Sequence, residues 1–392
     1  MRKSIIFILS VIVFASTSFA QETITKDTIV FTTIKENKIT PVKNQASSGT
    51  CWSFSGLAFF ESELLRMGKP EVDLSEMFVV HHSYQDKADK YVRTNGTINF
   101  AAGGSFHDVW YVVKNYGIVP ESVMNGLNYG TDKHNHGELD ALTKSLIAEV
   151  AKNPNKTISP AWKQAFNGIV DAYLGKLPTD FSIDGKKYTP VSYGQSLGLN
   201  LDDYISITSF THHPFYTKFA IEIPDNWRWG ESYNVPLDEF ARIFDYALNN
   251  GYTMAWGSDV SEKGFTRDGL GLLPETNKEN LTGTDQGKWL EEQKSNKKYE
   301  IKSPIKEQTV NQETRQEGFD NRQTTDDHGM LIYGIAQDQN GTEYYMVKNS
   351  WGTTSKYQGV WYVSKPFVLN KTINIFVHKN AVPKEIRKKM GI

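Results

Sequence analysis

Apolar positions in the first half of the chain recur at spacings typical of amphipathic helices. The clearest stretch follows Cys51, where apolar side chains lie three or four positions apart as far as Leu65. Gly68 and Pro70 end this pattern, which predicts a helix from Cys51 to about Arg66. Similar patterns predict helices over 106–115, 138–152, 161–174 and 237–248, and another that begins near residue 76.

The last third of the chain instead has the short β-prone runs that are typical of a sheet. Strands are expected over 252–257, 330–335, 343–348 and 359–363, with an earlier one over 204–210 and an N-terminal strand or arm around Ile29 and Phe31. These patterns predict an α+β fold. We expect a mainly helical lobe over residues 21–250 and a β-rich lobe over residues 251–392.

The first twenty residues have the pattern of a secretory signal peptide. Arg2 and Lys3 precede a short apolar core over residues 5–14, and Ser18-Phe19-Ala20 is a small-x-small cleavage site. The apolar core is too short to serve comfortably as a membrane anchor. We therefore expect cleavage before Gln21, export, most simply to a periplasm, and no membrane association afterwards.

Charge and cysteine content narrow the function classes further. The 392 residues carry a net charge of −2, so the overall balance does not favour a nucleic-acid partner. Cys51 is the single cysteine, which excludes an intramolecular disulfide. A cysteine at a helix N-terminus is expected to have a lowered pKa, because the helix dipole favours the thiolate. The alternative is that Cys51 is a small buried apolar residue.

Two later segments favour the catalytic interpretation. His328 precedes one β-prone run, and Asn349 ends another. A cysteine nucleophile needs a base to accept its proton, and the base needs a partner that orients it. Cys51, His328 and Asn349 can supply these three roles.

These segments resemble those of the papain-like cysteine peptidases. Gln45 lies six residues before Cys51, Trp52 follows it, and Asn349-Ser350-Trp351-Gly352 matches the motif around the family's asparagine. The resemblance implies that Gln45 helps to form an oxyanion hole and that Trp351 shields the bond between histidine and asparagine. It also implies that Gly103 and Gly104 lie along the cleft and bind the substrate backbone.

The 277 positions between Cys51 and His328 are similar to the spacing in the bleomycin hydrolase and aminopeptidase C branch of that family. This resemblance implies a helical and a β-rich lobe with large insertions, over about 125–250 and 258–325. It implies peptide substrates, no cofactor, and closed homo-oligomers that are commonly hexamers. Members of the branch are mostly cytoplasmic, and their C-terminal arm enters the cleft to hold the substrate's amino group.

The present chain stops soon after a basic segment at 384–389, and we expect it to lack most of that arm. The branch resemblance implies an aminopeptidase, and the missing arm leaves an endopeptidase with an open cleft as the alternative. A catalytically silent peptide-binding protein is a second alternative. A metallohydrolase is disfavoured because the sequence has no His-Glu-x-x-His or Cys-x-x-Cys motif. No metal is expected, and we interpret His134 and His136 as loop histidines.

Overall fold

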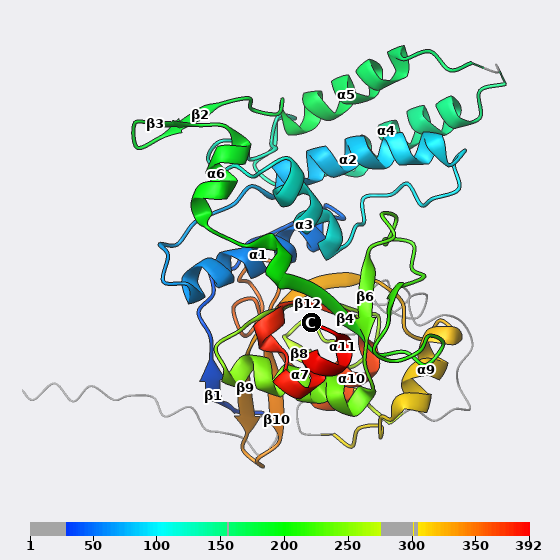
Figure 1. Ribbon diagram of the computed structural model, residues 1–392. Coiled ribbons are helices and arrows are strands. Elements are labelled where there is room, and N and C mark those ends of the chain that lie inside the picture. The colour runs from blue at the N-terminus through cyan, green and yellow to red at the C-terminus, as the bar shows by residue number, and fades with distance from the viewer. Residues whose placement is uncertain (1–28, 155–156, 276–300, 302–304) are drawn as a thin grey trace, which may run out of the picture.

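The computed structural model describes residues 29–154, 157–275, 301 and 305–392, and it has a helical half and a half built on a large sheet (Figure 1). The leader expected over residues 1–20 lies outside these ranges. Among the helices in the described ranges, none combines the length and the apolar character needed to cross a bilayer.

The helix α1 (Cys51–Arg66) lies where the two halves meet, and nearly all of its residues are buried. On one side it packs against α3, where Gly56 allows close approach because a Cβ at that position would lie 2.7 Å from Val109 Cγ2. On the other side it packs against the sheet, where Trp52 and Ser55 contact Gly329. The expected helix from Cys51 to Arg66 is therefore confirmed, and both halves fix its position.

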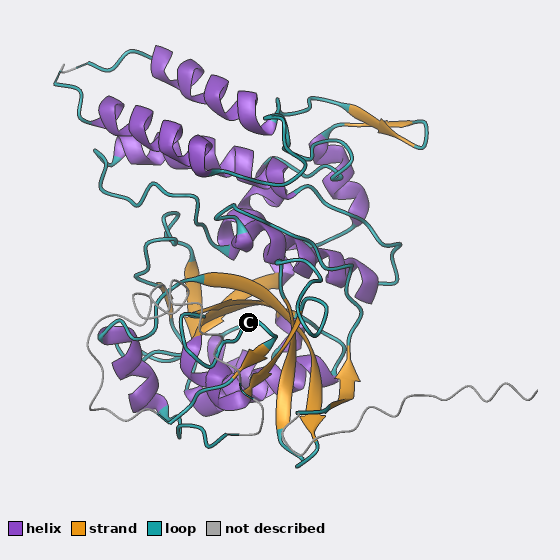
Figure 2. Cartoon of the chain, turned by 180° about the vertical axis from the view of Figure 1, so that it is seen from behind, coloured by secondary structure: helices purple, strands orange, loops and turns teal. Residues whose placement is uncertain are grey.

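Amphipathic helices surround α1 in the helical half, in agreement with the hydrophobic spacing. Ser75 caps the next helix by accepting a hydrogen bond from the backbone N–H of Phe78. A short hairpin projects from this half beside α6 (Figure 2). The elements are α2 (Glu76–Arg93), α3 (Phe106–Asn115), α4 (Gly137–Ala151), α5 (Ala161–Leu174), β2 (Phe181–Ile183), β3 (Lys186–Tyr188) and α6 (Pro190–Leu197).

The second half is a ten-stranded sheet with the strand order β5-β6-β4-β12-β7-β9-β10-β11-β8, in which β1 pairs with β9. Its strands are β1 (Phe31–Glu36), β4 (Tyr204–Thr208), β5 (Lys218–Ala220), β6 (Glu231–Asn234), β7 (Met254–Ser258), β8 (Leu270–Gly271), β9 (His328–Asp338), β10 (Glu343–Lys348), β11 (Val360–Ser364) and β12 (Thr372–His378). The helices α7 (Leu237–Asn249), α9 (Gln312–Asp320), α10 (Lys365–Lys371) and α11 (Lys384–Met390) accompany them.

The boundary between the halves differs from the one expected near residue 250. The strands β4, β5 and β6 all precede residue 250, yet they join the large sheet through the pairing of β4 with β12. The β-rich half therefore begins near Tyr204. Periodicity identified the strand at 204–208 but could not assign it to a half, because its partner β12 lies some 170 residues later in the chain.

The polar composition of residues 258–325 suggests a surface insertion, but part of this stretch is buried. Residues 276–300 and 302–304 lie outside the described ranges. Arg315 of α9, however, is fully buried and donates hydrogen bonds to the carbonyls of Ser209, Leu369 and Thr372. The part of this stretch around α9 thus ties the start of β12 to the segment after β4.

Candidate active site

Cys51 is the first residue of α1 and is half-buried. The turn before it is held by the hydroxyl groups of Ser48 and Thr50, which lie 2.6 Å apart, and by the Thr50 carbonyl, which accepts from the backbone N–H of Ser53. The first N–H groups of a helix have no acceptor within the helix. The thiol and the backbone N–H of Cys51 therefore both lie at the N-terminal end of α1.

His328 and Asn349 come together because β9 and β10 are antiparallel neighbours, so the start of β9 lies beside the end of β10. His328 Nε2 lies 2.7 Å from Asn349 Oδ1. The same oxygen accepts from the backbone N–H of Ser350 at 2.7 Å, which identifies it as the amide oxygen. His328 must therefore carry its proton on Nε2, and the Nδ1 lone pair is left to act as a base.

Trp351 packs against His328. Its ring stacks on the imidazole of His328 with the centroids 4.7 Å apart, and it meets Phe265 and Trp361 edge-on. The three aromatic rings form an apolar wall behind His328. This arrangement strengthens the bond to Asn349, because water competes poorly where the local dielectric constant is low.

Gln45 is buried and connects the loop before Cys51 to the segment that follows β10. Its Oε1 accepts from the Ser350 hydroxyl at 2.6 Å, and its Nε2 donates to the Ser48 carbonyl at 2.8 Å. An amide nitrogen carries two hydrogens. One is therefore used to hold the loop, and the other is available to a ligand.

Gly103 and Gly104 lie immediately before α3, beside the start of α1. The indole Nε1 of Trp52 donates to the Ala102 carbonyl at 3.0 Å, and a Cβ on Gly104 would lie 2.8 Å from that indole. The Gly103 carbonyl accepts from the buried Lys87. A Cβ on Gly103 would overlap the carboxylate of Asp225, so this side of Gly103 is covered.

One pocket contains both reactive side chains. Cys51 and His328 line it together with Ser105 and Phe106 from the start of α3. Residues from other parts of the chain also line it, among them Ile221, Ile223, Asn226, Ser232, Gly257, Asp326, Asp327 and Asn374. The structure thus places Cys51, His328 and Asn349 at one site. Next to it, Gln45 contacts Ser350, and Trp351 contacts His328.

The electrostatics of the site differ from the expectation based on the helix N-terminus. Burial, with smaller contributions from the charges of Asp326 and Asp225, raises the pKa of Cys51 to about 12. Burial lowers the pKa of His328 to about 4. The resting pair is thus neutral at pH 7, since burial disfavours each separate charge more than the helix end favours a thiolate. Proton transfer from Cys51 to His328 creates both charges at once and lets them attract each other.

Sequence patterns missed the acidic groups around the pocket. Asp326 and Asp327 directly precede His328, and Asp225 comes from the loop between β5 and β6. Burial, followed by the charge of Asp259, raises the pKa of Asp327 to about 7. The position of Asp326 and Asp327 next to His328 was the available signal. Asp225 had none, because it lies 174 positions after Cys51 in a loop without a motif.

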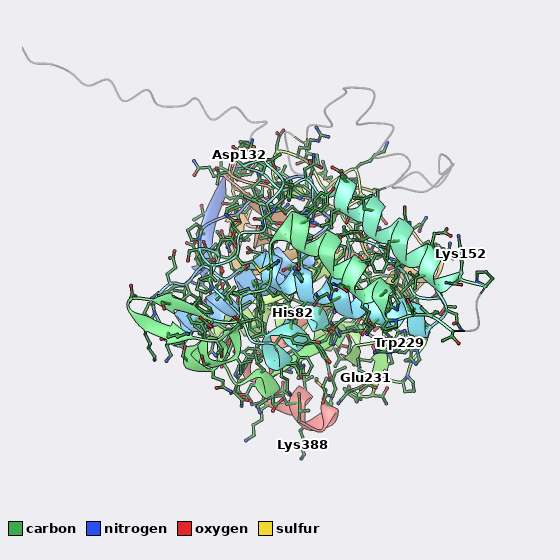
Figure 3. The ribbon with its side chains drawn as sticks, turned by 90° about the horizontal axis from the view of Figure 1, so that it is seen from above. His82, Asp132, Lys152, Trp229, Glu231 and Lys388 are labelled. Carbon is green, nitrogen blue, oxygen red and sulfur yellow. The ribbon has the colours of Figure 1, made fainter. Side chains whose placement is uncertain are left out.

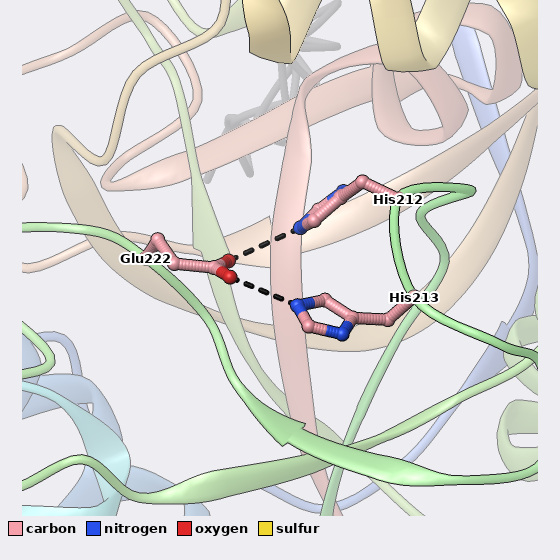
Figure 4. A group of neighbouring side chains, drawn as sticks. All are labelled: His212, His213 and Glu222. Atoms are coloured by element: carbon pink, nitrogen blue, oxygen red, sulfur yellow. Dashed lines mark hydrogen bonds and ion pairs between the residues drawn. The ribbon is translucent and has the colours of Figure 1, made fainter.

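His212, His213 and Glu222 form a group that has the composition of a metal site (Figure 4). Each histidine Nε2 faces one oxygen of Glu222, at 3.1 and 2.9 Å. The Gln316 amide donates to Nδ1 of His212 at 3.0 Å, and its own oxygen accepts from the Thr211 N–H. His212 therefore carries its proton on Nε2 and donates it to Glu222, which leaves no lone pair there for a metal. The group fastens two loops together.

The C-terminal residues pack far from this chemistry in the described structure. Ile386 and Met390 of α11 are buried in the core that α7 also lines, and Lys389 pairs with Glu239 of α7. Residues 384–392 are not among those that line the pocket of Cys51.

Comparison with known proteins identifies the class. Residues 29–182 match the family described as papain family cysteine protease, and residues 283–391 match the Peptidase C1-like family. The fold is similar to that of PepW from Lactobacillus rhamnosis HN001, with a TM-score of 0.68 and 21% identity over 92% of this chain and 84% of that one. The chain belongs to the papain-like cysteine peptidases and is a cysteine-type peptidase.

Relatives place it more narrowly, in the aminopeptidase C and bleomycin hydrolase branch. The chain is 24% identical to aminopeptidase G of Lactobacillus delbrueckii subsp. lactis and 22% identical to aminopeptidase C of Lactococcus lactis subsp. lactis. Each match covers 88% of this chain and 82% of the relative. The papain-like α+β fold expected from the sequence is confirmed.

Proposed function

We propose that the protein is an exported aminopeptidase that releases residues from peptide N-termini by a Cys-His-Asn mechanism. The observation that carries this proposal is the shared pocket of Cys51 and His328, with His328 oriented by Asn349 at 2.7 Å. Relatives named as aminopeptidases support the choice of exopeptidase. Covering of Gly103 by Asp225 also supports it, because the family resemblance implies that a longer peptide would bind along that surface.

In the proposed mechanism, Nδ1 of His328 takes the thiol proton as Cys51 attacks the peptide carbonyl. The backbone N–H of Cys51 and the free Nε2 hydrogen of Gln45 stabilise the oxyanion. His328 then protonates the departing amine, and water hydrolyses the thioester with His328 again acting as the base. Asn349 keeps the imidazole in the productive tautomer throughout, and Gly104 contributes backbone contacts to the substrate.

A matched pair of fluorogenic peptides tests the proposed specificity. One peptide has a free N-terminus, and the other has the same sequence and is N-acetylated. We expect cleavage of the free peptide at its first bond, with the acetylated peptide cleaved at least about tenfold more slowly, because one charged hydrogen bond is lost. Equal cleavage of both, with internal fragments in the mass spectrum, would instead indicate the open-cleft endopeptidase.

Export is proposed on the basis of the signal-like pattern in residues 1–20. The mature protein is then expected to begin at Gln21 and to reside outside the cytoplasm, most simply in a periplasm. N-terminal sequencing of the protein from fractionated cells measures both properties. A cytosolic protein that retains residues 1–20 would contradict export without affecting the proposed chemistry.

Self-association into a closed homo-oligomer is proposed from the branch resemblance and from the projecting β2–β3 hairpin (Figures 1 and 2). Phe181 and Tyr188 of the hairpin pack against Tyr193 of α6, which leaves the exposed turn at Asp184 and Gly185 to contact a neighbouring subunit. Sedimentation at micromolar concentration is expected to give a species larger than a monomer. A single monomeric species at that concentration would refute this proposal.

A further inference from the structure

The loop between β5 and β6 forms part of the wall around Cys51. Ile221, Ile223 and Asn226 line the same pocket as Cys51 and His328. Two of these side chains are apolar, so this side of the pocket has an apolar lining. The loop therefore forms an apolar boundary of the pocket that contains the Cys51 thiol.

Hydrogen bonds make this loop rigid. The side chain of Asn226 donates to the carbonyls of Ile221 and Gly230 at 3.0 Å each and accepts from the Gly230 N–H at 2.8 Å. Arg228 fastens the loop to the helical half through 2.7 Å ion pairs with Asp108 of α3 and Asp86 of α2. Figure 3 shows Trp229 and Glu231 of this segment towards one side of the helical half, where Lys90 of α2 lies 3.3 Å from the Trp229 ring centroid.

Asp225 is the acidic residue that this loop holds between the pocket-lining residues Ile223 and Asn226. Its carboxylate lies against the α-carbon of Gly103, and only glycine leaves room for it there. Asn99 donates to Oδ1 at 3.3 Å, and within the described ranges no cation lies in ion-pair contact with either oxygen. Lys87 is the nearest compensating charge, but its ammonium group donates to the carbonyls of Ala101 and Gly103.

Two carboxyl groups, Asp225 and Asp326, act on Cys51, and the structure distinguishes between them. Burial and then the charge of Asp225 raise the pKa of Asp326 well above its usual range. Burial also raises the pKa of Asp225; the charge of Lys87 and the bond from Asn99 limit this rise, and the charge of Asp108 adds to it. Close carboxylates do not both ionise readily. Asp326 therefore takes the proton first, and Asp225 carries the negative charge.

We propose that the Asp225 carboxylate binds the α-ammonium group of the substrate and that the loop over 221–230 ends the binding site one residue before the scissile bond. This proposal rests on the proposed aminopeptidase function and gives it a structural basis within the chain. An ammonium group at this position would provide the cation that Asp225 lacks. It would also lower the pKa of Asp225, so that binding and ionisation reinforce each other.

The test compares two variants on two substrates. Asp225→Asn keeps the shape and the contact with Asn99 but removes the charge. Asp238→Asn, at an exposed aspartate of α7, is the matched control. The substrates are a fluorogenic peptide with a free N-terminus and its isosteric des-amino analogue. We expect Asp225→Asn to raise KM for the free peptide about 10- to 100-fold, as loss of a charged hydrogen bond predicts, and to leave the des-amino analogue unchanged.

Several outcomes would overturn the assignment. If wild-type enzyme prefers the free peptide and Asp225→Asn retains that preference, the aminopeptidase function stands but Asp225 is not the anchor. If Asp326→Asn removes the preference instead, Asp326 is the anchor. If wild-type enzyme cleaves both substrates equally, the proposed function itself fails. Asp225→Ser, which is smaller and also uncharged, gives the same comparison if the melting temperature shows that Asp225→Asn does not fold.

Discussion

Replacing Cys51 by alanine is expected to abolish peptide hydrolysis, with a loss of about 10⁴-fold or more in kcat/KM. The thiol lines the same pocket as His328, which can act as its base, and no second cysteine can replace it. The measurement is hydrolysis of a peptide with a free N-terminus by protein purified away from the peptidases of the host.

The fold is expected to survive this substitution, because Cys51 is half-buried at the end of α1 and the helix depends on its buried apolar residues. An unchanged circular dichroism spectrum and a melting temperature within a few degrees of the wild-type value provide the control. Turnover at the wild-type rate by a folded Cys51→Ala protein would rule out the cysteine mechanism.

His328→Ala is expected to lower kcat/KM nearly as much as Cys51→Ala does. The rate of alkylation of Cys51 tests the cause, which is loss of the base. Without His328, no neighbouring base accepts the thiol proton, and burial keeps the pKa of Cys51 well above pH 7, so the thiol is almost entirely protonated. Alkylation by iodoacetamide at pH 7 should fall at least about 100-fold, since only the thiolate reacts. The rate should then rise about tenfold per pH unit, because the thiolate fraction grows with pH below the pKa.

Wild-type protein should instead keep a nearly constant alkylation rate from neutral pH down towards pH 4, below which His328 is protonated and can no longer take the thiol proton. Asn349→Ala provides a graded control: it should lose activity by only about 10- to 100-fold, because water can partly replace an orienting amide. Equal alkylation rates in wild type and His328→Ala at pH 7 would contradict the proposed pairing.

Helical spacing and the short catalytic motifs were sufficient to predict much of the molecule. The hydrophobic pattern after Cys51 predicted α1 because a helix buried on most sides needs apolar residues at every turn. The segments around His328 and Asn349 were informative because His328 begins β9, Asn349 follows β10, and these two strands are neighbours in the sheet. The same reasoning located α5 over Ala161–Leu174 as observed.

The remaining features depend on contacts that no local pattern encodes. Asp225 reaches Gly103 only because Asn226 and Arg228 fix its loop, and those bonds join residues as much as 142 positions apart. The pKa of Cys51 depends on how deeply the finished fold buries the thiol, whereas sequence shows only that a helix begins there. The position of the C-terminal segment could not be predicted from local sequence either, because it depends on the packing of α11 against α7.

Covalent labelling with an aminoacyl chloromethyl ketone tests the account most directly, with the N-acetylated form as comparison. Attack by the thiolate on the methylene carbon forms a thioether and releases chloride, so the mass of the labelled peptide identifies the nucleophile. We predict one label per chain on Cys51, formed at least about tenfold faster with the free amine than with the acetylated reagent. A label on another residue, or equal rates for the two reagents, would contradict the account of a cysteine aminopeptidase built around Cys51.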